Sequence, residues 1–338
     1  MFKKLGFILF ALVFAGICTV GVLYMHLMSW ADRPAGKTST EKLFTIAAGQ
    51  GLRKTAHALR KEDLVSDALR FTILARLKKK DKLIKAGEYF LSTGMTPNQI
   101  LGQMVEGRVH LYRLTIPEGF SLVQIAAAVS EAGLASEKEF LAAARSTETA
   151  EGLGIDAETL EGYLFPDTYY FPRGLDSATI IATMVKQFEA AFKAEWHEQA
   201  QKIGLSVHEV VTLASIIEKE TGAPDERPLI GSVFHNRLKK GMRLETDPTV
   251  IYGIPDFDGN IKRRHLETYT PYNTYKIKGL PPGPIASPGA LAIQAALYPA
   301  QSAYLYFVSK KDGTHQFSRT IKEHNAAVRK YQLRKRKR

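Results

Sequence analysis

The sequence predicts an α+β protein with one N-terminal transmembrane helix, a small α/β subdomain and a larger mixed α+β domain. Three observations predict this class. A long apolar run follows the first lysines, short strand and helix patterns alternate through the first third of the chain, and long helical patterns follow. The 338 residues are 45% hydrophobic and 24% charged, which is the composition of a chain that folds around a real core.

The N-terminal apolar run is the strongest physical signal. Lys3 and Lys4 precede residues 5–28, and no Asp, Glu, Lys or Arg follows until Asp32. A run of roughly 20 apolar residues spans a bilayer as a helix, and the lysines before it predict a cytoplasmic tip at residues 1–4. The run exceeds the roughly 7–15 residues of a signal-peptide core, so an uncleaved anchor is favoured over a cleaved signal.

Charge and cysteine content limit the possible partners. The net charge of +12 favours an anionic partner, which could be a membrane surface, a nucleic acid or an acidic polymer. The outward orientation of the chain argues against nucleic acid. Cys18 is the only cysteine, so an intrachain disulfide and a cysteine-based metal cluster are excluded. No HExxH spacing and no phosphate-binding glycine motif occur, so neither a metal nor another cofactor is expected.

Residues 29–43 form a polar sequence that predicts a linker. A strand at 44–46, a glycine turn and a helical pattern follow, and the same order returns 70 residues later from Leu114. Between the two copies, a strand is predicted at 88–91 and a helix from Pro97. Small strand–helix units of this kind resemble LysM carbohydrate-binding modules, which makes residues 44–110 a LysM-like subdomain. A generic spacer that holds an enzyme off the membrane is an equally good interpretation.

Residues 111–338 predict the larger domain, ending in a basic tail at 329–338 that is expected to be solvated. The stretch 241–288 is rich in Gly, Pro, Asn and Tyr with little periodicity, and long irregular stretches inside a domain are usually functional. The predicted elements are helices at 178–200, 207–221 with a cap at Ser206, and 225–240, a strand at 304–308, and a last helix opened by Ser318 or Thr320.

The helical pattern that ends in Ile216-Ile217-Glu218-Lys219-Glu220 carries the first candidate for chemistry. At 100° per residue, Glu218 falls near apolar side chains, whereas Glu220 points about 200° away and is expected in water. A carboxyl group in apolar surroundings has a raised pKa, which suits a general acid. Taken alone, Glu218 is more often a surface glutamate paired with a lysine.

Several sequence runs, which follow one another along the chain, favour a catalytic role for Glu218 over a surface role. Residues 161–169, 214–220, 233–238, 246–253, 272–285 and 304–308 closely resemble the YceG-like family of endolytic murein transglycosylases, over essentially the whole chain. The resemblance implies a lyase that cuts the bond between N-acetylmuramic acid and N-acetylglucosamine within glycan strands and leaves 1,6-anhydro ends. The family's catalytic glutamate lies in the run at 216–220 and is assigned here to Glu218.

Further candidates follow from that resemblance. Asp247 is the best second carboxylate, although a turn role before Pro248 competes with catalysis. Tyr163, Asn236 and Asn273 are candidate substrate contacts, each as compatible with a structural role. The expected location is the bacterial inner membrane as a single-pass protein with a periplasmic catalytic domain. Peptidoglycan strands, the inner membrane and peptidoglycan synthases such as penicillin-binding proteins are the expected partners.

Two other functions remain open from the sequence. A hydrolytic muramidase would use Glu218 together with Asp247 or Glu245. A non-catalytic peptidoglycan-binding scaffold would also account for the LysM-like pattern and the basic charge. The expected cellular role of the enzyme is to terminate or trim nascent strands beside the membrane.

Overall fold

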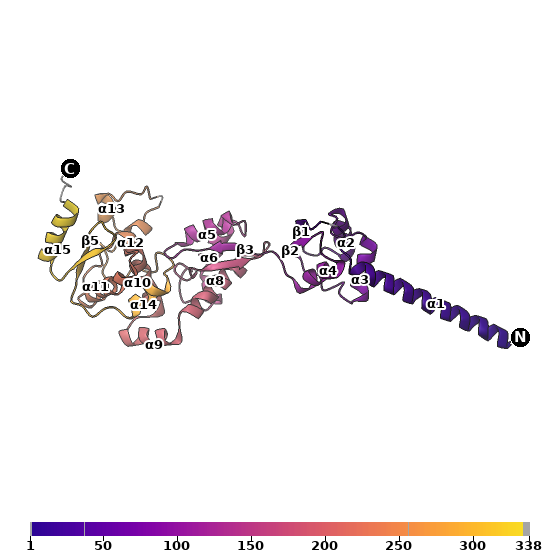
Figure 1. Ribbon diagram of the computed structural model, residues 1–338. Coiled ribbons are helices and arrows are strands. Elements are labelled where there is room, and N and C mark those ends of the chain that lie inside the picture. Colours follow the sequence, from indigo (N-terminus) through magenta and orange to yellow (C-terminus); the bar gives the residue numbers. More distant parts are fainter. Residues whose placement is uncertain (1, 37, 256, 334–338) are drawn as a thin grey trace. The chain divides into compact units, whose positions relative to one another are not determined.

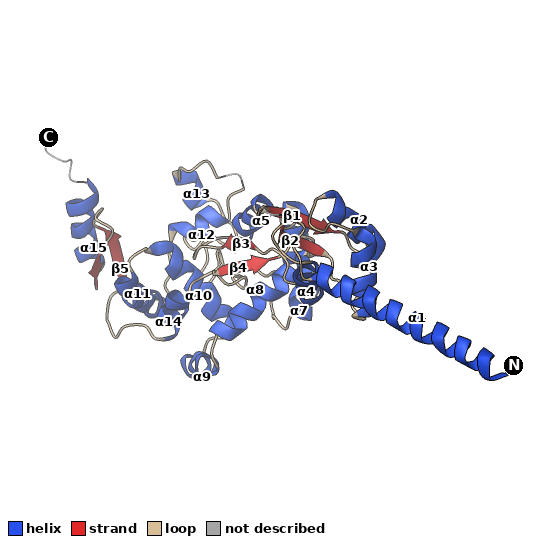
Figure 2. Cartoon of the chain, turned by 45° about the vertical axis from the view of Figure 1, so that its right-hand side comes forward, coloured by secondary structure: helices blue, strands red, loops and turns tan. Residues whose placement is uncertain are grey.

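The computed structural model describes residues 2–36, 38–255 and 257–333, and the chain divides into two compact units (Figure 1). The first unit holds Met1–Tyr112 and Pro172–Gly174, and the second holds Arg113–Phe171 and Leu175–Arg338. Helices and strands occur in both units (Figure 2). The predicted α+β class with one N-terminal apolar helix is confirmed.

The first unit is built around a two-stranded antiparallel sheet. Its strands pair from Glu41 opposite Ser92 to Ile46 opposite Gly87, and two helices lie between the strands in sequence. A capping box at Thr96 starts the following helix with Pro97 in its first turn, as predicted. The elements are α1 (Phe2–Ala31), β1 (Glu41–Ile46), α2 (Leu52–Lys61), α3 (Ala68–Leu77), β2 (Gly87–Ser92) and α4 (Pro97–Glu106).

Helix α1 is long and apolar enough to cross a membrane, and its last turn belongs to the core of the first unit. Leu27, Trp30 and Ala31 are buried against α3 and α4, and Ala31 is fully enclosed. The linker is therefore shorter than the predicted range 29–43, because α1 continues to Ala31 and β1 already begins at Glu41. The apolar anchor and the small unit are joined by packed side chains, not only by a flexible segment.

The second unit begins with the repeated strand–turn–helix pattern that the sequence predicts. A second helix and a returning strand extend the repeat, and the strand pairs with the first one. Positive φ angles at Gly49 and Gly119 mark the two equivalent turns. The elements are β3 (Tyr112–Thr115), α5 (Leu122–Glu131), α6 (Glu137–Ala144), α7 (Thr147–Gly152) and β4 (Thr168–Phe171).

The prediction of a single helix at 178–200 is wrong. The structure has α8 (Ser177–Ala191) and α9 (Ala194–Ile203), because Phe192 and Lys193 leave the helical conformation. The break lets the Phe192 ring contact both Phe188 and Trp196, at centroid distances of 5.6 and 5.7 Å. Helical periodicity continues through the break, so the sequence pattern does not reveal it.

Helix α10 (Val207–Glu220) is the central element of the second unit. Ser206 and Glu209 form the capping box at its start, and its residues from Val210 to Ile217 are all buried. It packs against α14 (Ala290–Leu297), α11 (Arg227–Lys239) and α9. Helices α11 and α14 approach closely at Gly231, where a Cβ atom would lie 2.6 Å from the carbonyl oxygen of Ala295. The C-terminal end of α10 is thereby held in a fixed position.

The remaining elements surround that end of α10. Most of the stretch at 241–288 is irregular, as expected, with two short helices inside it. Thr320, not Ser318, caps the last α-helix. The tail residues 334–338 lie outside the described residues. The elements are η1 (Pro224–Glu226), α12 (Asp247–Tyr252), α13 (Arg263–Glu267), the antiparallel pair β5 (Tyr306–Ser309) and β6 (His315–Ser318), α15 (Ile321–Val328) and η2 (Arg329–Leu333).

Candidate active site

The C-terminal end of α10 opens into a cavity of about 420 Å³. Glu220, the last residue of the helix, lines this cavity, whereas Glu218 is not among the lining residues. The other walls come from the 244–247 loop, from Tyr275, from β5 and from α15. The lining residues are Glu220, Arg237, Leu244, Glu245, Asp247, Tyr275, Tyr306, Phe307, Val308, Ile321 and His324.

The carboxyl group of Glu220 is enclosed by protein at the floor of this cavity. Burial raises the pKa of Glu220 to about 7, while a hydrogen bond from the Thr246 hydroxyl opposes the rise. The negative charge of Asp247 adds to the increase, and the positive charge of Arg237 lowers it. The carboxyl-terminal end of a helix also disfavours an anion. Glu220 can therefore hold a proton near neutral pH.

The expectation that Glu220 lies in water is wrong. The helical wheel places Glu220 away from the packed side of α10. The segment after α11, however, folds over the side that carries Glu220. Thr246 in this segment is buried and bonds to Glu220. A non-local loop thus converts an apparent surface position into the floor of a cavity, which helix periodicity cannot predict.

Glu218 has a different environment, although it is only two residues away. Its side chain is 6% exposed, and its Oε1 atom accepts a hydrogen bond of 2.8 Å from Arg227, which is 7% exposed. Its Oε2 atom accepts a bond of 3.0 Å from the backbone N–H of Gly289, at the start of α14. Arg227 also lies 3.4 Å from Glu118. Both oxygens of Glu218 are therefore used by hydrogen bonds to the protein.

The end of α10 thus presents two carboxyl groups in opposite situations. Glu218 joins α10 to α11 and α14 as a buried ion pair, whereas Glu220 faces a cavity and carries a raised pKa. The assignment of catalysis to Glu218 stays a prediction, and Glu220 is a second candidate for the same role.

Asp247 lies in the same cavity as Glu220, at the first position of α12. Its Oδ1 atom accepts a hydrogen bond of 2.8 Å from the Tyr275 hydroxyl, while its side chain remains exposed. Asp247 is thus a second carboxylate beside Glu220, and its place at a helix start also satisfies the competing turn role. Both interpretations of Asp247 are compatible with this position.

Three cavity residues were not among the candidates named from the sequence. Arg237 is buried and donates from Nη1 to the carbonyl oxygens of Arg243 and Leu244, at 3.2 and 2.9 Å. Its guanidinium also lies 5.1 Å from the centre of the Tyr306 ring, which in turn stacks on His324 at 5.3 Å. The result is an aromatic wall beside the acid, the kind of surface on which sugar rings stack. Only the three-dimensional pairing of α11, β5 and α15 brings these side chains together.

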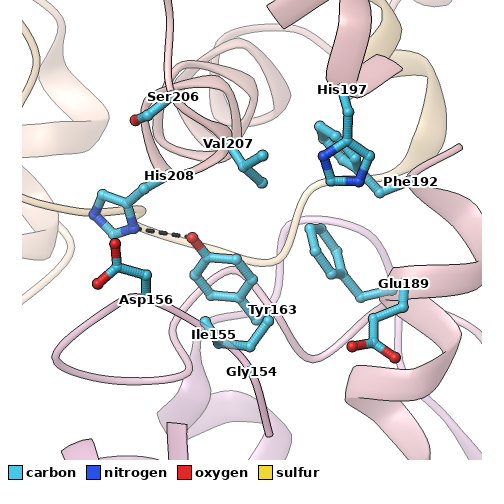
Figure 3. A pocket seen from close by; sticks show the side chains of 11 residues that line it. Gly154, Ile155, Asp156, Tyr163, Glu189, Phe192, His197, Ser206, Val207 and His208 are labelled. Atoms are coloured by element: carbon cyan, nitrogen blue, oxygen red, sulfur yellow. Dashed lines mark hydrogen bonds between the residues drawn. The ribbon is translucent and has the colours of Figure 1, made fainter. Parts of the chain in front are cut away.

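Tyr163 lines a different cavity, of about 550 Å³ (Figure 3). Its hydroxyl lies 2.9 Å from Nδ1 of His208, and its ring contacts Phe188 edge-on. Burial raises the pKa of Tyr163 above its usual value. His208 is in the first turn of α10, so this cavity is roughly 18 Å along the helix from Glu220. Tyr163 is therefore not part of the Glu220 cavity.

Asn236 and Asn273 make contacts that favour the structural alternative for each. Asn236 donates to the carbonyl oxygens of Ser302 and Tyr304, at 3.0 and 2.9 Å. Asn273 is fully buried, and it donates to three carbonyl oxygens of the 265–268 segment and accepts from the Tyr275 backbone. These bonds hold the segments before β5 and around residues 265–268 in place, and they occupy the amide nitrogens of both side chains.

The Glu220 carboxyl, whose pKa burial raises to about 7, shares its cavity with Arg237 and an aromatic wall, an arrangement compatible with acid–base cleavage of glycans. Comparison with known proteins agrees with this class. The chain belongs to the YceG-like family, whose model matches residues 44–330.

Three relatives show the extent of the similarity. An endolytic murein transglycosylase of Bacillus subtilis is 34% identical over 328 residues, covering 92% of this chain and 91% of the relative. An endolytic murein transglycosylase of Streptococcus pneumoniae is 29% identical, and the match covers 96% of this chain but 64% of that longer protein. A crystal structure of a yceG-like protein from Listeria monocytogenes matches with a TM-score of 0.59 and 35% identity, covering 86% of this chain and 99% of that one.

Proposed function

We propose that this protein is an endolytic lytic transglycosylase that cuts murein glycan strands, with Glu220 as its acid and base. The observation that carries the proposal is the position of Glu220 at the end of α10, in a cavity that Arg237, Asp247 and Tyr275 also line, where burial raises its pKa to about 7. The names of the relatives and the family membership support the same reaction class. Glu218, two residues earlier, remains the alternative acid, and it would first have to leave Arg227.

One carboxyl group suffices for this reaction. Protonated Glu220 donates its proton to the glycosidic oxygen as the bond between that oxygen and the anomeric carbon of N-acetylmuramic acid breaks. The C6 hydroxyl of the same sugar then forms a bond to the anomeric carbon and gives its proton back to Glu220. A 1,6-anhydro end results and no water is consumed. The intramolecular nucleophile replaces the second carboxylate that ordinary glycosidases require.

The geometry assigns supporting roles to the other cavity residues. The Arg237 guanidinium and the Tyr306 ring contribute an aromatic part of the lining, and Asp247 with Tyr275 contributes a polar part. We expect the aromatic wall to stack on a sugar ring and Asp247 to orient the substrate or its loop. Asp247 also supplies the specific observation for a second candidate function, a hydrolytic muramidase, because such an enzyme needs a second carboxylate to activate water.

The mass of the products distinguishes the two reactions. Purified peptidoglycan digested by the full-length protein is expected to give fragments whose new ends lack one water relative to reducing ends. Fragments with reducing ends only would establish the muramidase and overturn the lytic proposal. Binding of glycan without any new ends would support a scaffold instead.

The location of the protein follows from its anchor. We propose that α1 crosses the inner membrane with its N-terminus in the cytoplasm and that the second unit works in the periplasm, trimming or terminating nascent strands. Peptidoglycan synthases such as penicillin-binding proteins would be neighbours there. The order strand, two helices, strand in the first unit supports a LysM-like role in holding glycan.

The rate of cleavage should depend on pH through Glu220. The acid must be protonated, so the rate is expected to fall as the pH rises through about 7. Asp247→Asn removes a negative charge that raises the pKa of Glu220, so the midpoint of this fall should move to lower pH, by less than about one unit because Asp247 is exposed.

Rates of fragment release measured from pH 5 to 9 test this prediction. Asp258→Asn is the matched control, because Asp258 is exposed and does not line the Glu220 cavity. An Asp247→Asn midpoint equal to that of the control would show that Asp247 does not act on the titrating group. A profile without any fall between pH 6 and 8 would contradict the role of Glu220 as the acid.

A further inference from the structure

Helix α3 carries an apolar stripe that is exposed among the described residues of the first unit. Leu69, Ile73 and Leu77 recur every four residues, and their exposed fractions are 69%, 41% and 54%. At 100° per residue they form one face, opposite to the face with Phe71, Leu74 and Ala75 that is buried in the core. Three large aliphatic side chains on one exposed helix face need a partner surface.

The charge around this stripe is strongly positive. Residues 70–85 contain seven lysine and arginine residues and a single aspartate, Asp81. Lys78 and Lys79, directly after α3, and Lys82 are exposed, and Leu83 beside them is 54% exposed. An apolar stripe with lysines along its border is the pattern of a helix that lies in the interface of an anionic bilayer.

The packing of α1 places α3 beside the last turn of this apolar helix. Before α3, the Ser66 hydroxyl accepts a hydrogen bond of 2.7 Å from Nε1 of Trp30. After α3, Lys78 donates to Asn98 at 2.6 Å, and Asn98 donates to Asp32 at 2.6 Å. The segment before α3 is thus linked to Trp30 in the last turn of α1, and the residue after α3 is linked through Asn98 of α4 to Asp32, just beyond α1.

This arrangement places α3 beside the end of α1, because α3 also packs directly against that helix. Trp30 is the kind of residue that sits at a membrane–water boundary. If α1 runs across the bilayer, α3 lies close to that boundary.

We infer that α3 is an interfacial helix that binds the surface of an anionic bilayer through the Leu69–Ile73–Leu77 face and the lysines that follow it. The first unit is then held flat on the membrane by two contacts, the α1 span and the α3 face. This inference rests on the proposed membrane anchoring, and it adds a fixed orientation of the first unit at the lipid surface.

Spin labels on the full-length protein in nanodiscs that contain phosphatidylglycerol test the inference. In a Cys18→Ala background, labels at Ile73→Cys and Leu77→Cys should be accessible to oxygen and protected from a water-soluble nickel chelate, at a depth of roughly 5–10 Å below the headgroup boundary. Thr45→Cys, at an exposed position on β1, is the matched control and should be fully accessible to the chelate.

A spin label on native Cys18 shows whether the membrane anchoring of α1 or only the interfacial position of α3 is wrong. Cys18 is exposed on α1, so a label there reports whether α1 is in lipid. A buried Cys18 label together with chelate-accessible labels at 73 and 77 would overturn the interfacial helix and leave the anchor intact. A chelate-accessible Cys18 label would overturn both. Loss of the protection at 73 and 77 in zwitterionic nanodiscs, or after Lys79→Gln and Lys82→Gln, is expected because the lysines bind anionic headgroups.

Discussion

Replacing Glu220 by glutamine is expected to reduce strand cleavage by about 10²–10⁴-fold, the contribution of a positioned general acid. Glutamine keeps the shape and can still accept a hydrogen bond from Thr246, so the fold should persist. It cannot donate an acidic proton to the glycosidic oxygen or take one back from the C6 hydroxyl. Release of soluble fragments from purified peptidoglycan measures the loss, and glycan binding by the same variant should be retained.

Glu218→Gln is the matched control, since it makes the same chemical change two residues away on the same helix. If Glu220 is the acid, Glu218→Gln retains cleavage in the fraction of protein that folds. If instead Glu218→Gln is inactive while folded and Glu220→Gln is active, the original assignment of Glu218 holds and the role proposed for Glu220 is wrong. A circular dichroism melt of each variant separates loss of chemistry from loss of fold.

The sequence predicted much of the architecture because local signals agree with the fold. The capping residues Thr96 and Ser206 mark helix starts correctly, and the apolar run predicts α1. The break at Phe192 was missed, because aromatic packing between non-adjacent side chains overrides a continuous helical pattern. The end of the anchor was also missed, because burial of Ala31 depends on α3 and α4.

The candidate site was harder to predict than the fold. The sequence located it within the run 216–220, but helix periodicity placed Glu220 in water and Glu218 in apolar surroundings. The structure gives Glu218 a charged partner, Arg227, and gives Glu220 a cavity. Both facts depend on segments that follow α10 in the chain and fold back on it. A pattern within one helix carries no information about such contacts.

Arg227→Met is expected to lower the free energy of unfolding by about 3–5 kcal/mol, the largest stability effect in the second unit that the structure suggests. Arg227 and Glu218 are both almost fully buried, so removal of the cation leaves the Glu218 carboxylate with the Gly289 N–H as its remaining donor. Charge that is buried without a counterion is costly even when it is hydrogen-bonded. Denaturant unfolding of the full-length protein in detergent, monitored by circular dichroism, measures the effect.

The double variant Arg227→Met with Glu218→Met then tests whether the ion pair serves the stability of the fold or the catalytic reaction. Replacement of a buried ion pair by apolar side chains of similar volume is often neutral, so most of the lost stability should return. A stable double variant that still cleaves glycan strands would show that Glu218 serves the fold and that the acid lies elsewhere, at Glu220. A double variant that is stable but inactive would return the catalytic role to Glu218, and Arg227 would then be the residue that controls its charge.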